Sequence, residues 1–262
     1  MSKVSLQMYT VRKFMETRED FLATLKKVAA IGYKNVQIRI PAFMTVEECA
    51  AALKDAGLKA ESAMSNYDDT IIERLPETVK AAQIFDCDLI RTSSIPEDLR
   101  YSEDGYHAFA RKLNEAGKAF TREGLKLTYH FHAFEHINFP TCTGMDILLN
   151  ETDPRYVYFQ PDVFWLAAAG KEPSQALKDY KGRCSYIHIK DYAISAPTET
   201  IIEKVPMISV PVGEGNLNWP GILKTAEEIG VTMYVMEDDL GPVDPFESAA
   251  TSLKNLRKMG IE

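Results

Sequence analysis

Residues Leu125–His136, which read LKLTYHFHAFEH, join an apolar run typical of a buried strand to a cluster of polar side chains. The run follows Gly124, a residue type that commonly ends helices. Its last eight residues, Tyr129–His136, hold three of the chain's five histidines and Glu135. Buried imidazoles and carboxylates cost free energy unless they have a partner. We therefore expect the end of this strand to form one corner of a metal or acid–base site.

The same order of strand and helix repeats along the chain. Strands are expected at Val4–Tyr9, Tyr33–Ile40, Leu58–Met64, Leu89–Thr92, Leu125–Phe131, Tyr156–Pro161, Cys184–Ile189 and Val231–Glu237. Start and stop signals, such as the Thr45–Glu48 capping box, predict the helices. These are Thr17–Ile31, Thr45–Ala56, Asp69–Phe85, Ser102–Glu123, Gly144–Asn150, Pro173–Tyr180, Pro220–Ile229 and Pro245–Met259.

Eight alternations of strand and helix in about 250 residues predict a (β/α)8 TIM barrel. A doubly wound open sheet is the rival fold, but it requires a glycine-rich GxGxxG turn that this chain lacks. No low-complexity linker divides the sequence, so residues 1–262 are expected to form one domain. The long loops after the fifth and seventh strands are expected to be functional.

The composition narrows the class of protein. The net charge is −8 without a basic block, which argues against a nucleic-acid partner. No window approaches the length of a membrane span. The four cysteines are widely spaced and the first residues contain no apolar signal region, so we expect a cytoplasmic protein with reduced thiols.

Four side chains stand where the last four predicted strands end. Glu135, Asp162, His188 and Glu237 are separated by 27, 26 and 49 residues, which matches one β/α unit per step with a long loop in the last. In a barrel these strand ends meet at one mouth. Like charges at one point need a cation, so this set predicts a site for a divalent metal ion.

Six motifs also carry a family resemblance. LQMYTVR, YHFHAFE, PDVFW, GRCSYIHIKD, PVGEGNLNW and YVMED occur in the order found in sugar phosphate isomerase/epimerase-like members of the xylose isomerase-like barrel superfamily. The chain resembles this family over nearly its whole length. The resemblance implies metal ligands at Glu135, Asp162, His188 and Glu237, the positions that spacing selects. It also implies that two glutamates act as an acid–base pair on opposite faces of the substrate carbon.

The chain departs from the family pattern at several positions. Phe131 replaces an asparagine and His136 replaces an aromatic residue in the fifth-strand motif. Strand alternation predicts that His130 and His132 face inward while Phe131 packs outward. Trp165 stands where the ketose epimerases have a substrate-binding histidine, and Gln37 follows Val36 where relatives often have a glutamate. A histidine common after the third strand is also missing, so a standard ketose epimerase is disfavoured.

The predicted site divides into three roles. Glu135, Glu237 and His132 are the candidate catalytic residues. Substrate binding is assigned to His130, Lys190, Trp165, Gln37 and Gln7. The expected cofactor is a divalent metal ion, with manganese first and Mg, Co or Zn as alternatives. Structural interpretations compete with these roles: Asp162 as a helix cap, His188 as a core imidazole, Lys190 paired with Asp191, Trp165 as packing, and His136 as a loop residue.

Three functions fit these residues. The first is an isomerase or epimerase, in which a metal-polarised carbonyl lets Glu135, Glu237 or a histidine remove a proton from the neighbouring carbon of a sugar or keto-sugar. The alternative is a lyase or dehydratase that expels a β-substituent, with a possible partner subunit. The second alternative is a non-catalytic sugar-binding barrel. The expected partner is a small sugar, and a homo-oligomer or a second subunit remains possible. An endonuclease barrel needs a basic groove, which this chain lacks.

Overall fold

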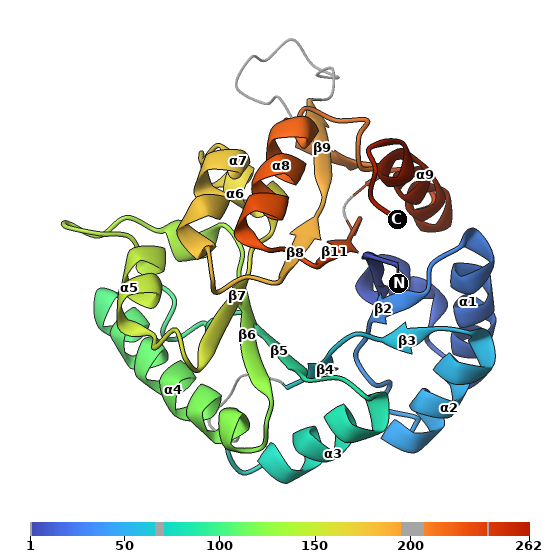
Figure 1. Ribbon diagram of the computed structural model, residues 1–262, viewed down its shortest axis with the longest axis horizontal. Coiled ribbons are helices and arrows are strands. Elements are labelled where there is room, and N and C mark those ends of the chain that lie inside the picture. Colours follow the sequence, from blue (N-terminus) through green and yellow to red (C-terminus); the bar gives the residue numbers. More distant parts are fainter. Residues whose placement is uncertain (1, 66–70, 195–206, 240) are drawn as a thin grey trace.

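The computed structural model describes residues 2–65, 71–194, 207–239 and 241–262. Its strands form an inner ring, and its helices lie outside the ring (Figure 1). The strands are β1 (Val4–Gln7), β2 (Asn35–Gln37), β3 (Lys59–Ala60), β4 (Ala63–Met64), β5 (Leu89–Ser93), β6 (Lys126–His130), β7 (Val157–Gln160), β8 (Tyr186–Ile189), β9 (Asp191–Ile194), β10 (Met207–Val210) and β11 (Met233–Met236). The predicted (β/α)8 barrel is confirmed.

Helices follow the strands in the expected alternation. The α-helices are α1 (Arg18–Ile31), α2 (Val46–Ala56), α3 (Leu75–Phe85), α4 (Glu103–Arg122), α5 (Gly144–Glu151), α6 (Val163–Ala168), α7 (Pro173–Ala176), α8 (Trp219–Ile229) and α9 (Pro245–Lys258). Short 3₁₀ helices are η1 (Met8–Phe14), η2 (Phe134–His136) and η3 (Leu177–Tyr180). The Thr45–Glu48 capping box is present at α2. None of the helices in the described ranges has the length and apolar character of a membrane span.

The strands of the ring pair in parallel in two sheets, with orders β3-β2-β1-β11-β8 and β4-β5-β6-β7. The expected third strand is interrupted at residues 61–62, so its first half pairs with β2 and its second half with β5. Between β7 and β8, which belong to different sheets, the backbone amide of His188 donates to the carbonyl of Pro161 at 2.8 Å, and Asp162 and His188 form an isolated parallel bridge. These links bring the ends of β7 and β8 together.

Several features differ from the expected elements, among them helix α6, which was not predicted. Strand β1 ends at Gln7 instead of Tyr9, because the chain turns into η1 there. The helix expected at Pro173–Tyr180 is α for one turn and then 3₁₀. The long connection after β8 contains an antiparallel hairpin, β9–β10, that the sequence did not reveal. The helix expected at Asp69–Phe85 begins only at Leu75, after a turn at residues 71–74, and its residues 69 and 70 lie outside the described residues.

Strand β6 places its side chains on two faces, as its alternation predicts. Phe131 is fully buried and packs against Tyr180 and Phe159, with ring centroids 5.4 and 6.5 Å away. His130 and His132 instead line the cavity at the barrel mouth. The replacement at position 131 therefore affects the outer layer of the barrel and leaves both histidines at the mouth.

Candidate metal centre

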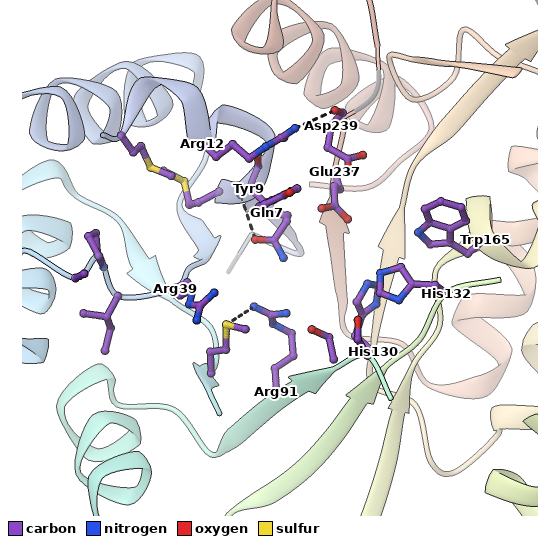
Figure 2. Close-up of a pocket in the computed structure, with 18 residues that line it drawn as sticks. Gln7, Tyr9, Arg12, Arg39, Arg91, His130, His132, Trp165, Glu237 and Asp239 are labelled. Atoms are coloured by element: carbon purple, nitrogen blue, oxygen red, sulfur yellow. Dashed lines mark hydrogen bonds between the residues drawn. The ribbon is translucent and has the colours of Figure 1, made fainter. Parts of the chain in front are cut away.

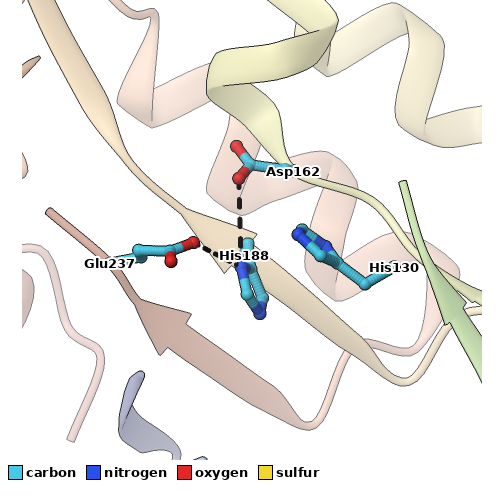
Figure 3. Close-up of side chains that lie close together, drawn as sticks. All are labelled: His130, Asp162, His188 and Glu237. Carbon is cyan, nitrogen blue, oxygen red and sulfur yellow. Dashed lines mark hydrogen bonds and ion pairs between the residues drawn. The ribbon is translucent and has the colours of Figure 1, made fainter. Parts of the chain in front are cut away.

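Four buried side chains converge at the mouth of the barrel. They are His130 at the end of β6, Asp162 at the start of α6, His188 in β8 and Glu237 just after β11. Each offers one nitrogen or oxygen, and these atoms all lie within 4.8 Å of one another. Figure 3 shows His188 between the two carboxylates, with His130 beside it. Three of the four residues predicted from strand spacing thus meet at one point.

The ring of His188 is oriented by a residue on the opposite side of the barrel. Its Nε2 lies 2.7 Å from Oε1 of Gln37, an oxygen that can only accept, so Nε2 carries the hydrogen. The amide nitrogen of Gln37 donates to Glu61 at 2.8 Å, which fixes which end of the amide faces His188. In neutral His188 this arrangement leaves a lone pair on Nδ1, which faces Oε2 of Glu237 at 3.0 Å and Oδ2 of Asp162 at 3.9 Å.

The tautomer of His130 is set by a backbone carbonyl. Its Nδ1 lies 3.3 Å from the carbonyl oxygen of Gln160, and this contact requires Nδ1 to be the donor. The lone pair of neutral His130 is therefore on Nε2. The ring stacks on His188 with a centroid separation of 4.0 Å. Burial lowers the pKa of both histidines, and the charges of their neighbours add to this for His130, so both rings are neutral near pH 7.

Asp162 has one satisfied oxygen and one unsatisfied oxygen. Oδ1 caps α6 by accepting from the amides of Phe164 at 2.9 Å and Trp165 at 3.3 Å. Oδ2 is buried without a hydrogen bond to any described residue. Burial raises the pKa of Asp162 to about 8, although the charge of Lys190 opposes this shift. Asp162 is therefore both the helix cap of the structural interpretation and a member of the converging group.

A second buried aspartate shows what a purely structural carboxylate looks like in this fold. Oδ1 of Asp191 accepts from Tyr192 and Leu217, while Oδ2 accepts from the amides of Gly213 and Gly215 and from Nε1 of Trp219. A Cβ at Gly215 would collide with this carboxylate. Asp162 differs from Asp191 because its Oδ2 accepts no hydrogen bond from any described residue, as expected for an oxygen that is available to a ligand.

These donors fit a divalent metal ion. Two neutral imidazoles present lone pairs, and two carboxylates face the same point. Without a cation, the lone pair of His188 would face the carboxylate of Glu237 and repel it. Glu237 is ionised: burial raises its pKa, but its contact with His188 and the positive charges of Lys190 and Arg91 lower it to about 2. Two nitrogen and two oxygen ligands suit a first-row transition metal better than magnesium.

The structure places Glu135, the expected first ligand, outside this group. Glu135 lies in η2 and is fully buried. It accepts a hydrogen bond from the hydroxyl of Tyr129 and another, of 2.9 Å, from the amide of His132. Burial raises its pKa to about 7, although these hydrogen bonds oppose the shift. The chain turns at the end of β6, so the carboxylate of Glu135 points back beneath the turn, and His130 is the fourth side chain that converges with Asp162, His188 and Glu237.

A cavity of about 770 Å³ opens above the centre (Figure 2). His130 and Glu237 line it and connect it to the metal group, and the predicted residues Gln7, His132 and Trp165 line it as well. Gln37 and Lys190 do not line it. Gln37 is buried below His188, and Lys190 forms an ion pair with Asp239 behind the ring of Trp165.

Lys190 acts on the site through charge. Burial alone would lower its pKa, but the charges of Asp162, Glu237 and Asp239 raise it, so the ammonium form persists. The predicted structural pairing of Lys190 with Asp191 is not formed, because Asp191 is occupied by the loop amides. His136 faces away from the site and contacts the ring of Phe131.

Sequence reasoning missed the arginines of the cavity. Arg12, Arg39 and Arg91 all line it. Arg91 could have been noticed because it interrupts the apolar strand LIRTS of β5, where a charged residue needs a reason to be buried. Arg39 lies in an exposed loop after β2 and Arg12 is half-buried in η1, and neither position carries a comparable signal in the sequence.

Comparisons with known proteins agree with this architecture. Residues 25–259 match the family described as xylose isomerase-like TIM barrel. Among curated proteins, the chain is 27% identical over 160 residues to an inosose dehydratase of Clostridium botulinum (strain Alaska E43 / Type E3), covering 57% of this chain and 53% of that protein. An inosose dehydratase of Bacillus anthracis (strain CDC 684 / NRRL 3495) is also 27% identical, over 60% of this chain and 56% of its own. The chain thus spans about half the length of these relatives.

Solved structures share the fold over nearly the whole chain. A sugar phosphate isomerase/epimerase from Parabacteroides distasonis superposes with a TM-score of 0.77 at 23% identity, covering 98% of this chain and 93% of that one. The IOLI protein, whose structure has a bound zinc atom, has a TM-score of 0.69 at 17% identity and covers 97% of both chains. The match over residues 25–259 and the barrel itself lead to one conclusion: this chain belongs to the xylose isomerase-like TIM barrel family.

Proposed function

We propose that this protein is a divalent-metal-dependent enzyme that removes a proton beside the carbonyl of a sugar or keto-sugar and expels water from the neighbouring carbon. The observation that carries the proposal is the buried group His130, Asp162, His188 and Glu237 at the floor of the cavity. Its nitrogen and oxygen atoms can ligate a metal ion, and it opens to a space that is large enough for a sugar. The inosose dehydratases among the relatives support the choice of elimination.

The four side chains of the group would hold the metal ion. A divalent ion bound there supplies Lewis-acid chemistry, which polarises the substrate carbonyl and makes the adjacent C–H more acidic. Manganese is our first choice, with zinc and cobalt next. Gln37 keeps Nδ1 of His188 free of a hydrogen by holding the other ring nitrogen. Lys190 holds Asp239 at the rim of the cavity and offsets the negative charge of Glu237.

His132 is the group best placed to take the proton. It lies on the cavity wall, where its ring approaches Trp165 edge-on at 5.6 Å. Its Nδ1 has no hydrogen-bond partner among the described residues. Burial lowers its pKa to about 4, partly opposed by Glu237, so the ring is neutral and can accept a proton near pH 7. Glu237, with a pKa of about 2, is better suited to ligation than to proton transfer.

The number of residues that can transfer a proton at the substrate carbon discriminates between the possible reactions. Epimerisation requires proton transfer on both faces of one carbon, and Glu135, the residue expected to provide the second face, is packed beneath the turn. A single base is sufficient for elimination, because it can take the proton from carbon and return it to the departing hydroxyl. A single base is also sufficient to move a proton between adjacent carbons, so isomerisation is the second candidate.

One experiment separates these outcomes. Protein loaded with manganese is incubated in deuterated water with a panel of keto-sugars and keto-inositols. NMR follows deuterium at carbon, and mass spectrometry follows the loss of one water. We expect both signals from the wild-type protein and neither from the His132→Ala variant. Deuterium incorporation without water loss would support isomerisation instead. Full turnover in a Glu237→Gln variant would overturn the metal-dependent mechanism, as would a purified wild-type protein that binds no metal.

A further inference from the structure

Two arginines of the cavity are not members of the metal group described above, although the charge of Arg91 acts on Glu237. Figure 2 shows Arg39 and Arg91 projecting into the cavity opposite His132 and Trp165. They come from the β2 and β5 sides of the barrel, whereas the metal group comes from β6, β7, β8 and β11. Arg91 and Ser93 lie two residues apart on β5 and share a face, and Ser93 pairs in register with His130. The arginine side therefore adjoins the metal group along the same cavity.

Arg91 is a buried cation that forms no ion pair within the described residues, although it feels the charges of Glu61 and Glu237. Its side chain is only 5% exposed, and its Nε has no hydrogen-bond partner among the described residues. Within the described chain, its guanidinium makes one hydrogen bond, from Nη2 to the thioether sulfur of Met64 at 3.4 Å, and a thioether is a weak acceptor. Guanidinium groups stay charged even when buried, and an unpaired buried charge is strongly unfavourable. A folded chain that keeps such a group indicates that a ligand pairs with it.

The neighbouring side chains also present free donors. Arg39 is exposed to the cavity and forms no hydrogen bond or ion pair with any residue in the described ranges. Ser93 and Ser94 line the cavity, and their hydroxyls likewise have no partner in the described part of the chain. Ser94 has a φ of 67°, in the left-handed region that costs free energy for a residue other than glycine. Such strain commonly marks functional sites.

The charges of the cavity do not balance without an anion. Asp162 and Glu237 would offset a divalent ion, and Lys190 offsets Asp239. Arg12 is held by the carbonyls of Tyr9 and Asp239 but keeps its charge. Glu61 interacts with Arg91 through charge, but its carboxylate accepts from Gln37 and forms no ion pair with Arg91 among the described residues. Arg39 and Arg91 thus leave excess positive charge at one end of the cavity.

We propose that Arg39 and Arg91, together with Ser93 and Ser94, form a subsite for an anionic substituent of the substrate, either a phosphate ester or a carboxylate. This inference rests on the proposed function and specifies the substrate class: a sugar or keto-sugar that carries its anion at the end away from the reacting carbonyl. Arginine forks bind both kinds of anion through paired hydrogen bonds, and serine hydroxyls add donors. The neutral part of the substrate then lies between this subsite and the metal group.

The test measures binding of small anions apart from turnover. Inorganic phosphate and acetate are titrated separately by calorimetry into manganese-loaded wild-type protein and into Glu237→Gln, Arg39→Met and Arg91→Met variants. Arg155→Met is the matched control, because Arg155 is an exposed arginine paired with Asp153 outside the cavity. We expect at least one anion to bind with an affinity that falls about 10-fold or more in Arg39→Met, and is unchanged in Arg155→Met. Arg39 is exposed, so its variant keeps the test valid if Arg91→Met fails to fold.

The outcomes separate this inference from the proposed function. Retained anion binding in Glu237→Gln supports the subsite even if the metal and the activity are lost. Stronger binding of phosphate indicates a phosphate ester, and stronger binding of acetate indicates a carboxylate. The inference is overturned if neither anion binds the wild-type protein, or if Arg155→Met weakens binding as much as Arg39→Met. It is also overturned if binding disappears in Glu237→Gln but persists in Arg39→Met, because the anion would then be a metal ligand.

Discussion

The two sides of the barrel mouth satisfy their charges in opposite ways. On the metal side, formed by β6, β7, β8 and β11, four side chains converge on one point, and a neighbour outside the group holds three of them, His130, Asp162 and His188. On the arginine side, formed by β2 and β5, Arg39 and Arg91 have almost no partners in the described chain. The metal side is arranged to hold a small cation, whereas the arginine side is left open for an anion. A substrate with two dissimilar ends fits this contrast.

The strongest test of the metal side compares two buried glutamates. Glu237→Gln removes a charged ligand, and we expect metal content to fall below about 0.1 equivalent and turnover to fall by more than about 100-fold. Mutation of a residue that only hydrogen-bonds to a metal ligand typically lowers metal affinity or activity 10–100-fold, so loss of a ligand itself should have a larger effect. Elemental analysis and initial rates provide the measurement. Glu135→Gln is the matched control and should keep its metal, since Glu135 lies outside the group. The opposite pattern, with metal lost only from Glu135→Gln, would restore Glu135 as the ligand.

Two aspartates give a second comparison of similar design. Asp162→Asn should weaken metal binding by roughly 100-fold, because it removes the unpaired oxygen that faces His188. Asp191→Asn should leave the metal in place but destabilise the fold by about 2–4 kcal/mol, because its carboxylate accepts from several loop amides. Competition with a metal chelator and urea denaturation measure the two effects. Equal metal loss in both variants would show that the loop, not the ligand, governs affinity.

Gln37 offers a smaller perturbation that reaches the metal side from across the barrel. Gln37→Met removes the acceptor that fixes the tautomer of His188. We expect metal affinity to fall about 10–100-fold, while saturating metal restores a stoichiometry near one. Gln7→Met is the control, since Gln7 bonds to Gln37 and not to His188. An unchanged affinity in Gln37→Met would mean that the tautomer is set by the metal group itself.

The smallest expected effect concerns the pH dependence of stability. Glu135 has a folded pKa of about 7, above its value of 4.5 in an unfolded chain. The unfolded state therefore loses its proton first, and the contribution of Glu135 to stability is present below pH 4.5 and is lost as the pH rises to about 7. The Glu135→Gln variant does not lose stability in this way, because glutamine does not titrate. Its stability relative to wild type should increase by on the order of 1–3 kcal/mol between these pH values and then level off.

Urea denaturation of the metal-free proteins at a series of pH values measures this difference. Metal-free protein is required because the metal group has its own pH dependence. His107→Gln is a useful control for surface effects, because His107 pairs with Glu151 on the outer face of α4. A stability difference between Glu135→Gln and wild type that stays constant with pH would show that Glu135 is ionised throughout.

The sequence predicted most of the barrel because its signals are local. Helix caps such as Thr17 and Thr45 and terminal glycines such as Gly32 and Gly57 are visible in the chain, and the structure has them. The break at residues 61–62 was not visible, because it depends on which neighbour each half of the strand pairs with. The hairpin β9–β10 was missed for the same reason. Two short strands give little periodicity until their partner is known.

The site was predicted in part. Asp162, His188 and Glu237 converge as the spacing of the strand ends predicted, because the repeating β/α unit keeps that spacing regular. Their role as metal ligands stays a prediction. Glu135 was expected with them, but it lies five residues beyond the end of β6, and its direction depends on the turn that η2 makes there. The arginines were not expected, because nothing in the local sequence shows that Arg39 and Arg91 face one cavity. Their roles in metal and substrate binding stay predictions.

By itself, the sequence determined the alternation of strands and helices, the barrel, and the strand ends that carry imidazoles and carboxylates, because each of these follows from neighbouring residues and a regular repeat. Only the tertiary structure decided which of these side chains share a point. It brought His130 to the point where Asp162, His188 and Glu237 meet and oriented His188 through Gln37. It also buried Arg91 with only the thioether of Met64 as a hydrogen-bond partner among the described residues. Such outcomes depend on contacts between residues far apart in the chain, where direction and burial, not residue type, determine the chemistry.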